Sequence, residues 1–275
     1  MKFERILCAI IEGRRQNLAL SWALKCASKC YETGVLLRHR AYDHKWLPTR
    51  KMPAFVISIG GIATGGTGKT PLARYFAQEL SAQCKVAILS RGYRSLAEHS
   101  KIPIKVEKGA RASFIGDEPL WLSLELPQVD VWVGKRRTAS ARRAIAEGAE
   151  ILILDDGMQH RRLERDLEIV SLDGGDLFGQ GHFLPRGYLR DHPKRLRYAD
   201  LIVVHDKDDA SEEELRKWTK APIVGMKQRL VTPIPKRIAV FCGIAKPGRF
   251  LKALSREAEV VKSLVVGDHR PISLK

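Results

Sequence analysis

The sequence lacks several features that would assign it to common classes of protein. It has no apolar run of about 18 residues, the length that a transmembrane helix requires. The short apolar stretch 7–11 is not followed by a small-residue cleavage site, so we expect no secretory signal peptide. Five cysteines, an odd number without zinc-like spacing, argue against a paired disulfide framework and fit free thiols in a reducing cytoplasm.

Acidic residues are also scarce, with 31 Asp and Glu against 48 Lys and Arg and a net charge of +17. Such a basic excess indicates an anionic partner, which is a nucleic acid, acidic lipid headgroups or a phosphorylated substrate. The excess is concentrated in residues 1–53, which hold eleven basic and four acidic side chains. Because no helix-turn-helix, zinc or aromatic RNA-binding signature is present, we do not expect a nucleic-acid partner.

After residue 53, strand-like and helix-like segments alternate, which is typical of a mostly parallel sheet covered by helices. One segment, 151–154, is apolar at every position, as a central parallel strand must be. The strand-like segments are 55–59, 86–89, 102–106, 129–133, 151–154, 167–172, 201–204 and 238–241. The helix-like segments are 70–81, 119–125, 135–148, 211–219 and 247–256.

The segment 64–70, Thr-Gly-Gly-Thr-Gly-Lys-Thr, is the most informative in the chain. It lies between an apolar strand and a helix, which is the layout of a nucleotide-phosphate loop, although Ala63 replaces the first glycine of the strict pattern. Backbone amides and the helix N-terminus would hold phosphate, Lys69 would reach the β- and γ-phosphates, and Thr70 would bind Mg²⁺. The residues expected to bind the nucleotide are Thr64, Gly65, Gly66, Thr67, Gly68, Lys69, Thr70 and Pro71.

Together these patterns predict an α/β fold of the P-loop NTPase type, with a mostly parallel sheet flanked by helices. Residues 51–224 form the predicted P-loop core. Residues 225–275 form a smaller C-terminal lobe that begins with a proline-containing connector. Residues 1–50 form a basic, amphipathic helical segment.

Within that N-terminal segment, residues 6–40 are predicted to be helical, with an interruption near Gly13. Side chains at helical spacing share one face, namely Leu20, Leu24, Ala27, Tyr31 and Val35. The opposite side carries Lys25, Lys29 and Glu32, close to Leu18 and Trp22. Two interpretations are open. The helix either packs on the core with a solvated basic face, or lies at a membrane surface with its tryptophan among the lipid headgroups.

Two aspartates end the apolar segment 151–154, at the edge where the ligands of parallel sheets gather. We predict that Asp155 and Asp156 hold Mg²⁺, directly or through water, because an acid at this strand tip does so in P-loop enzymes. An ordinary Asp-Gly turn is the alternative. Gln159 and His160 follow at once and would face the same crevice.

Three further motifs carry candidate catalytic side chains. Asp117 precedes a helix and is either its N-cap or a base that takes the proton of a substrate hydroxyl. The loop 181–197 is rich in arginine, whose planar fork suits phosphate oxygens. His269 follows a predicted strand and would orient a carboxylate base. The segment 206–209 resembles a guanine-reading loop but begins with Asp rather than Asn, so we expect ATP.

These motifs occur together and in a fixed order. They are Gly-Gly-Thr-Gly-Lys-Thr-Pro at 65–71, Ser-Arg-Gly-Tyr at 90–93, Gly-Asp-Glu-Pro at 116–119, Asp-Asp-Gly-Met-Gln-His at 155–160, Leu-Pro-Arg-Gly-Tyr-Leu-Arg at 184–190 and Asp-His at 268–269. The series resembles the tetraacyldisaccharide 4'-kinase family of lipid A biosynthesis. Two departures are Met158, where that family usually has Phe, and Arg-Gly-Tyr at 186–188, where it usually has Ala-Gly-Pro.

The resemblance implies an ATP- and Mg²⁺-dependent kinase that phosphorylates the 4'-hydroxyl of a tetraacylated glucosamine disaccharide 1-phosphate. It implies a peripheral enzyme at the cytoplasmic face of the bacterial inner membrane, with its N-terminal helix at the membrane surface and no protein partner. It gives catalytic roles to Asp117, His269, Lys69 and Arg190, and places near the metal Thr70, Asp155, Asp156 and Glu118. Arg137 matches a further basic residue. Family members usually continue beyond the position of Lys275, so a shortened C-terminal lobe is expected.

A membrane-associated regulatory P-loop ATPase is the alternative hypothesis. Such ATPases often carry an extra lysine early in the phosphate loop, and residues 61–67 contain none. The two hypotheses differ in whether ATP turnover depends on an acylated sugar acceptor.

Overall fold

The computed structural model of the chain describes residues 10–11, 17–227, 232–244 and 247–266. It divides into two compact units, Met1–Met226 and Lys227–Lys275. Each unit has its own sheet, so the two are taken separately. The predicted His269 lies outside the described residues.

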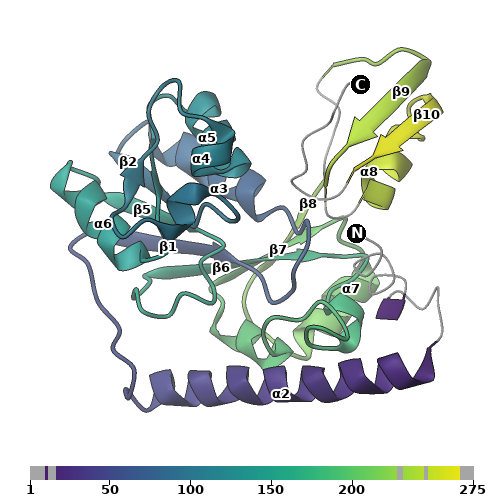
Figure 1. Cartoon of the computed structure of the whole chain (residues 1–275), viewed down its shortest axis with the longest axis horizontal. Helices are drawn as coiled ribbons and strands as arrows, with labels where there is room; N and C mark the ends of the chain where they lie inside the picture. Colours follow the sequence, from purple (N-terminus) through teal and green to yellow (C-terminus); the bar gives the residue numbers. More distant parts are fainter. Residues whose placement is uncertain (1–9, 12–16, 228–231, 245–246, 267–275) are drawn as a thin grey trace. The chain divides into compact units, whose positions relative to one another are not determined.

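Unit 1 is built on an eight-stranded sheet in the order β3-β4-β2-β5-β1-β6-β7-β8 (Figure 1). Its neighbouring strands run parallel, except for the antiparallel pair β3–β4. The strands are β1 (Phe55–Gly60), β2 (Val86–Ser90), β3 (Ile104–Lys105), β4 (Asp130–Val133), β5 (Ile151–Asp155), β6 (Leu167–Asp173), β7 (Leu201–His205) and β8 (Ile223–Met226). The predicted α/β fold with a mostly parallel sheet is therefore confirmed.

Helices cover both faces of this sheet, because alternate residues of a strand point to opposite sides. Ile57 and Ile59 of β1 pack with α3 and α5, whereas Val56 packs with α6. The β6–β7 part of the second face is covered by α7 and the segment before β7. The helices are α3 (Lys69–Leu80), α4 (Ala112–Ile115), α5 (Asp117–Glu125), α6 (Arg137–Ala146) and α7 (Asp209–Arg216), with short 3-10 turns η1 (Leu96–His99), η2 (Gly179–Gly181) and η3 (Pro193–Tyr198).

Three of the differences from the sequence prediction have a local physical cause. The strand expected at 102–106 is reduced to Ile104–Lys105, because Pro103 removes a backbone donor just before it. Strand β8 was not predicted, since four residues that include a glycine give a weak strand signal, and the boundary expected after residue 224 falls inside it. Helix α6 ends before the expected residue 148, where Gly148 adopts a φ of 91°.

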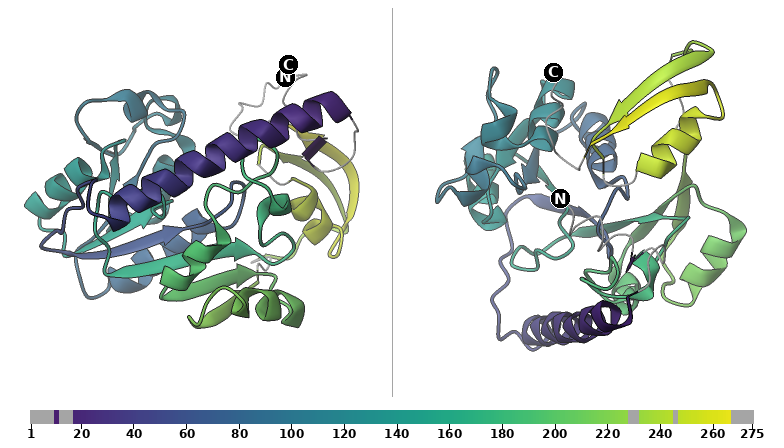
Figure 2. Two further views of the ribbon diagram at one scale, coloured as in Figure 1. Left: turned by 90° about the horizontal axis from the view of Figure 1, so that it is seen from below. Right: turned by 45° about the vertical axis from the view of Figure 1, so that its right-hand side comes forward.

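The N-terminal helix α2 (Leu18–Asp43) begins at Asn17, whose side chain accepts a hydrogen bond from the amide of Leu20. It packs along unit 1 as one continuous helix (Figure 2). Its buried side chains are Leu24, Ser28, His39 and Tyr42. Ala27, which the apolar pattern placed on the packed face, is exposed. The pattern was wrong there because polar side chains such as Ser28 and His39 make much of the contact, and apolar periodicity does not detect them.

Unit 2 contains two parallel strands, β9 (Arg237–Cys242) and β10 (Glu259–Val265), joined by α8 (Pro247–Leu254). A helix between two parallel strands is the expected crossover. Across both units, no helix within the described residues is long and apolar enough to cross a bilayer.

Candidate active site

The segment between β1 and α3 forms a glycine-rich loop that ends where α3 begins. Gly65 and Gly68 have φ values of 93° and 73°, which residues other than glycine rarely adopt. Gly68 is the N-cap of α3 and provides no side-chain cap for the first amides of the helix. Those amides and the helix dipole favour an anion at this position. The loop therefore has the backbone geometry that phosphate binding requires.

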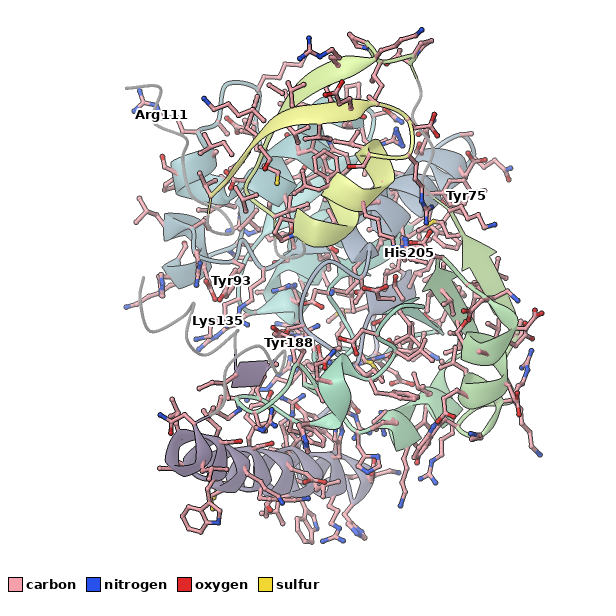
Figure 3. All side chains as sticks on the ribbon, turned by 90° about the vertical axis from the view of Figure 1, so that its right-hand side faces the viewer. Tyr75, Tyr93, Arg111, Lys135, Tyr188 and His205 are labelled. Carbon is pink, nitrogen blue, oxygen red and sulfur yellow. The ribbon has the colours of Figure 1, made fainter. Side chains whose placement is uncertain are left out.

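Side chains of strands β6 and β7 contact the phosphate loop. A β-carbon added to Gly68 would lie 2.0 Å from Nε2 of His205, at the end of β7, so only glycine fits there. The Ser171 hydroxyl of β6 donates to the carbonyl of Thr67. Figure 3 labels His205 and also Tyr188, whose carbonyl accepts the Thr64 amide at 2.8 Å. Sequence reasoning missed these supports, because no motif marks Ser171 or His205, and the motif at 184–190 pointed to arginine side chains rather than to the Tyr188 carbonyl.

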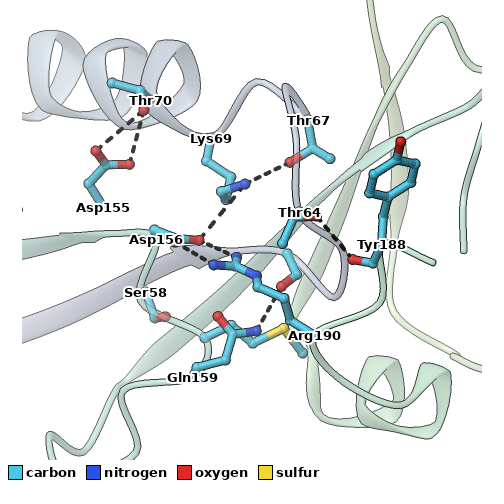
Figure 4. A network of polar contacts seen from close by, with 12 residues as sticks. Ser58, Thr64, Thr67, Lys69, Thr70, Asp155, Asp156, Gln159, Tyr188 and Arg190 are labelled. Carbon is cyan, nitrogen blue, oxygen red and sulfur yellow. Dashed lines mark hydrogen bonds and ion pairs between the residues drawn. The ribbon is translucent and has the colours of Figure 1, made fainter. Parts of the chain in front are cut away.

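Lys69 turns its ammonium group back into the site. Its Nζ donates to Thr67 Oγ1 at 3.1 Å and lies 3.8 Å from Asp156 Oδ1 (Figure 4). Burial lowers the pKa of this lysine below its ordinary value, and the nearby Asp156 charge opposes the shift. The Lys69 ammonium therefore lies where it could also bind an anion held by the phosphate loop.

Asp155, the last residue of β5, is buried beside the start of α3. Both of its carboxylate oxygens lie 3.4 Å from the Thr70 hydroxyl (Figure 4). Burial, together with the charges of Glu118 and Asp156, raises its pKa to about 7. Three carboxylates thus lie within electrostatic reach of one another, an arrangement that a cation relieves.

Asp156 adopts a φ of 55°, an uncommon value for a residue with a side chain, and turns its carboxylate toward Arg190. Arg190 donates from Nη1 to Oδ2 at 2.7 Å and from Nη2 to Oδ1 at 2.5 Å (Figure 4). Burial alone would raise the pKa of Asp156, but the hydrogen bonds and charge of Arg190, aided by Lys69, lower it overall. The Asp156 side chain is 38% exposed, so contact with water weakens its ion pair with Arg190.

Two further side chains complete this part of the site. Arg137 is buried at the start of α6, donates from Nη1 to the Gly134 carbonyl at 3.0 Å, and reaches the Asp155 carbonyl at 3.5 Å. Burial lowers its pKa to about 10, against the attraction of Asp155. Gln159 donates to the Gly61 carbonyl at 2.9 Å, just before the phosphate loop. Arg137 and Gln159 therefore lie in the site, as the sequence motifs suggested.

The first turn of α5 carries Asp117 and Glu118, both exposed. The N-cap of this helix is Gly116, with a φ of 98°, so the interpretation of Asp117 as the cap is wrong. The charge of Glu118 acts on both Lys69 and Asp155, so the first turn of α5 lies within electrostatic reach of the phosphate loop.

The family model for tetraacyldisaccharide-1-P 4'-kinase matches residues 20–275. The chain belongs to this family. It is 34% identical over 291 aligned positions to tetraacyldisaccharide 4'-kinase of Chlamydia pneumoniae, a match that covers 99% of this chain and 78% of the relative. It is 36% identical to the enzyme of that name from Anaeromyxobacter dehalogenans, covering 90% of this chain and 72% of the relative.

A solved structure of this 4'-kinase family agrees with the fold. The crystal structure of LpxK from Aquifex aeolicus in complex with ATP superimposes with a TM-score of 0.75 at 29% identity. The match covers 93% of this chain and 85% of that chain. The P-loop architecture of unit 1 is therefore that of a nucleotide-binding kinase family.

In this 4'-kinase family member, the segment 206–209 has a structural role. Asp208 is the N-cap of α7 and forms a capping box with Ser211. Lys207 pairs with Glu212 at 2.5 Å. Because these side chains bond within α7 and its cap, the resemblance to a guanine-reading loop carries no nucleotide specificity.

Proposed function

We propose that this chain is an ATP-dependent kinase that transfers the γ-phosphoryl group to the 4'-hydroxyl of a tetraacylated glucosamine disaccharide 1-phosphate. The observation that carries the proposal is the meeting of Lys69 and Arg190 at the Asp156 carboxylate, beside the phosphate loop of a 4'-kinase family member. Two cations converging at a phosphate loop stabilise the charge of a transferred phosphoryl group. The product would carry phosphate at both ends of the disaccharide.

Lys69 and Arg190 supply the positive charge in this proposal. Both now face Asp156, so the oxygens of an incoming triphosphate compete with that carboxylate for the same two cations. The Lys69 ammonium is 3.8 Å from Asp156, longer than a hydrogen bond, so little is lost when it turns to phosphate. Positioning and preorganised charge then provide most of the rate enhancement.

Asp117 is the proposed general base. Its exposed position at the start of α5 leaves room for a bulky acceptor beside the phosphate loop. The acceptor proton passes to the Asp117 carboxylate while the new oxygen–phosphorus bond forms and the bond to the β-phosphate oxygen breaks. His269 remains a proposed partner of this base.

Thr70 and Asp155 are the proposed holders of Mg²⁺. Their oxygens are hard donors 3.4 Å apart, and Mg²⁺ in kinases is usually held by one or two carboxylates together with substrate phosphates. The described residues contain no group of three His, Cys, Asp or Glu side chains that could form an all-protein cage. Asp156, bound to Arg190, and Glu118 would contribute through their charge. The bound ion would neutralise the charge on the phosphate oxygens.

We further propose that α2 seats the enzyme peripherally on the cytoplasmic face of the inner membrane, where its acylated substrate would lie. On the face of α2 that is turned away from the rest of unit 1, Leu18 and Trp22 are 88% and 70% exposed. Lys25 and Lys29 lie nearby and suit anionic headgroups. Trp22→Ser should weaken binding to anionic vesicles about 3- to 10-fold, whereas Tyr75→Ser, an exposed aromatic of α3, should not. Equal effects of the two substitutions would count against this orientation.

The kinase proposal has a direct test. Purified protein is incubated in detergent with γ-labelled ATP, Mg²⁺ and the tetraacylated disaccharide 1-phosphate, and the lipid is analysed for a second phosphate. We expect label in the lipid and none when the acceptor is omitted. ATP hydrolysis that is indifferent to the acceptor, with no labelled lipid, would instead support the regulatory ATPase.

A further inference from the structure

The segment that carries Arg190 runs beside the entrance to the phosphate loop. The Thr64 amide donates to the Tyr188 carbonyl at 2.8 Å, and the amides of Arg190 and Asp191 both donate to the Ile62 carbonyl, at 2.7 and 3.0 Å. The side chains of these two neighbouring residues have different partners. Arg190 bonds Asp156 in the site, whereas Asp191 bonds His39 of α2. A contact that holds Asp191 therefore acts on the same short backbone segment that carries Arg190.

Asp191 is held by His39, in the last third of α2. The Asp191 side chain is fully buried, and its Oδ1 lies 2.7 Å from His39 Nε2 and 3.1 Å from the amide of His192. Its Oδ2 has no hydrogen-bond partner among the described residues. His39 thus makes the side-chain hydrogen bond on which this buried carboxylate depends.

The neighbours of His39 decide which ring nitrogen carries the hydrogen. Arg161 Nη1 lies 3.2 Å from His39 Nδ1 and 3.1 Å from the His39 carbonyl. Because a guanidinium group only donates, Nδ1 must accept, and the hydrogen of the neutral ring is on Nε2, aimed at Asp191. Arg161 is itself fixed by Asp43 at 2.7 Å. The ring is therefore oriented from both sides.

We propose that His39 is a positioning residue for phosphoryl transfer, acting through Asp191 to aim Arg190. The inference rests on the proposed function, because it assigns Arg190 to the transferred phosphoryl group. The buried side of α2 thereby gains a part in catalysis, separate from its exposed face. A second contact points the same way, since Arg38 donates to the Gln159 carbonyl at 2.5 Å, and the Gln159 side chain bonds Gly61.

Loss of the ring should affect transfer more than ATP binding. In His39→Ala, the buried Asp191 keeps only a backbone donor, and the segment turns or takes up water to compensate. A misdirected Arg190 then stabilises the transition state poorly, and we expect kcat to fall about 10- to 100-fold with KM for ATP changed less than about 3-fold. His39→Gln retains an amide donor near the position of Nε2 and should restore most of the loss.

The matched control is Ser28→Ala. Ser28 also lies on the buried face of α2 and donates a buried hydrogen bond at 2.8 Å, but its acceptor is the Phe183 carbonyl rather than Asp191 or Arg190. The substitution Ser28→Ala removes one hydrogen bond between α2 and the core and leaves the contact between His39 and Asp191 in place. Similar kcat losses in Ser28→Ala and His39→Ala would reduce the role of His39 to docking the helix, and would overturn the inference.

A double-mutant cycle with Arg190→Ala separates positioning from general stability. If His39 acts through Arg190, adding His39→Ala to Arg190→Ala should cost less than about 2-fold in kcat, because the same contribution cannot be lost twice. A further loss as large as in the wild-type background would overturn the inference.

A measurement without substrate keeps the inference distinct from the kinase proposal. The Arg190 and Asp191 amides are bonded to Ile62, so their hydrogen exchange reports how firmly this segment is held. We expect exchange at both amides to accelerate about tenfold in His39→Ala, but not in Ser28→Ala. Unchanged exchange would overturn the inference even in an active enzyme, whereas accelerated exchange without lipid phosphorylation by wild type would count only against the proposed function.

Discussion

The phosphate-loop side of the site and the α5 side are built differently. On the first side, Lys69 and Arg190 both pair with Asp156, Lys69 also bonds Thr67 of the loop, and the three residues come from separated parts of the chain. On the second side, Asp117 and Glu118 are exposed on the first turn of a nine-residue helix. Folding alone therefore organises the charged groups around the phosphate loop, whereas the carboxylates at the start of α5 stay exposed to solvent.

The sharpest test of this contrast, and the largest expected effect, is Asp117→Asn. Removing a general base should lower kcat about 10²- to 10⁴-fold. The dissociation constant for ATP should change less than about 3-fold, because Thr67 and Lys69 of the phosphate loop are held by each other and by Ser171 of β6. Single-turnover transfer and equilibrium nucleotide binding measure the two quantities separately.

The control for that variant is Glu125→Gln, at the other end of the same helix. Glu125 pairs with Arg74 at 3.3 Å on the surface, so its loss alters helix charge without touching the site. Retained transfer in Asp117→Asn, or an equal loss in both variants, would remove Asp117 from the mechanism.

The phosphate-loop side can be broken by a single methyl group. In Gly68→Ala the new carbon would lie 2.0 Å from His205 Nε2, so the imidazole or the loop must move, and the φ of 73° is strained for alanine in any case. Overpacking and strain of this kind cost about 1–3 kcal/mol. The free energy of unfolding from urea titration should fall by that amount. Gly66→Ala is the matched variant, because nothing lies within 4 Å of its added carbon, and its unfolding should match wild type.

The same contrast explains which residues the sequence could predict. The phosphate loop and Asp155 were found because each follows an apolar strand, and parallel strands bring their carboxyl ends to one edge. His205 and Ser171 also end or line strands of that edge, but their sequence surroundings carry no phosphate motif. Their role comes from the order β1-β6-β7, which only the folded sheet supplies.

The contacts of α2 show a second limit on what the sequence can predict. The apolar pattern correctly included Leu24 and the partly buried Val35, yet it could not find His39, whose partner Asp191 is 152 residues away. A buried polar pair has no periodic signature, and its energy depends on two distant segments meeting. The presence of the helix was therefore predictable from local spacing, whereas the contact of His39 with Asp191 beside the site was not.

The smallest expected effect concerns acid stability on the phosphate-loop side. His160 follows Asp156 and Gln159, and its Nε2 has no hydrogen-bond partner among the described residues. Burial, together with the charges of Arg137 and Arg165, lowers its pKa to about 3. Because the folded protein resists protonation that the unfolded chain accepts near pH 6.5, the stability present above that pH is lost as pH falls toward 3.

His160→Gln should therefore flatten the acid side of the stability curve. One proton bound only by the unfolded state costs at most about 1.4 kcal/mol per pH unit, and solvent contact reduces this value. Asp155, whose raised pKa acts with the opposite sign, is present in both proteins, so the difference between their urea midpoints from pH 7 to 4 isolates His160. Parallel curves would mean that the loop opens before the imidazole is protonated, and the phosphate-loop side would then be less firmly enclosed than its hydrogen bonds indicate.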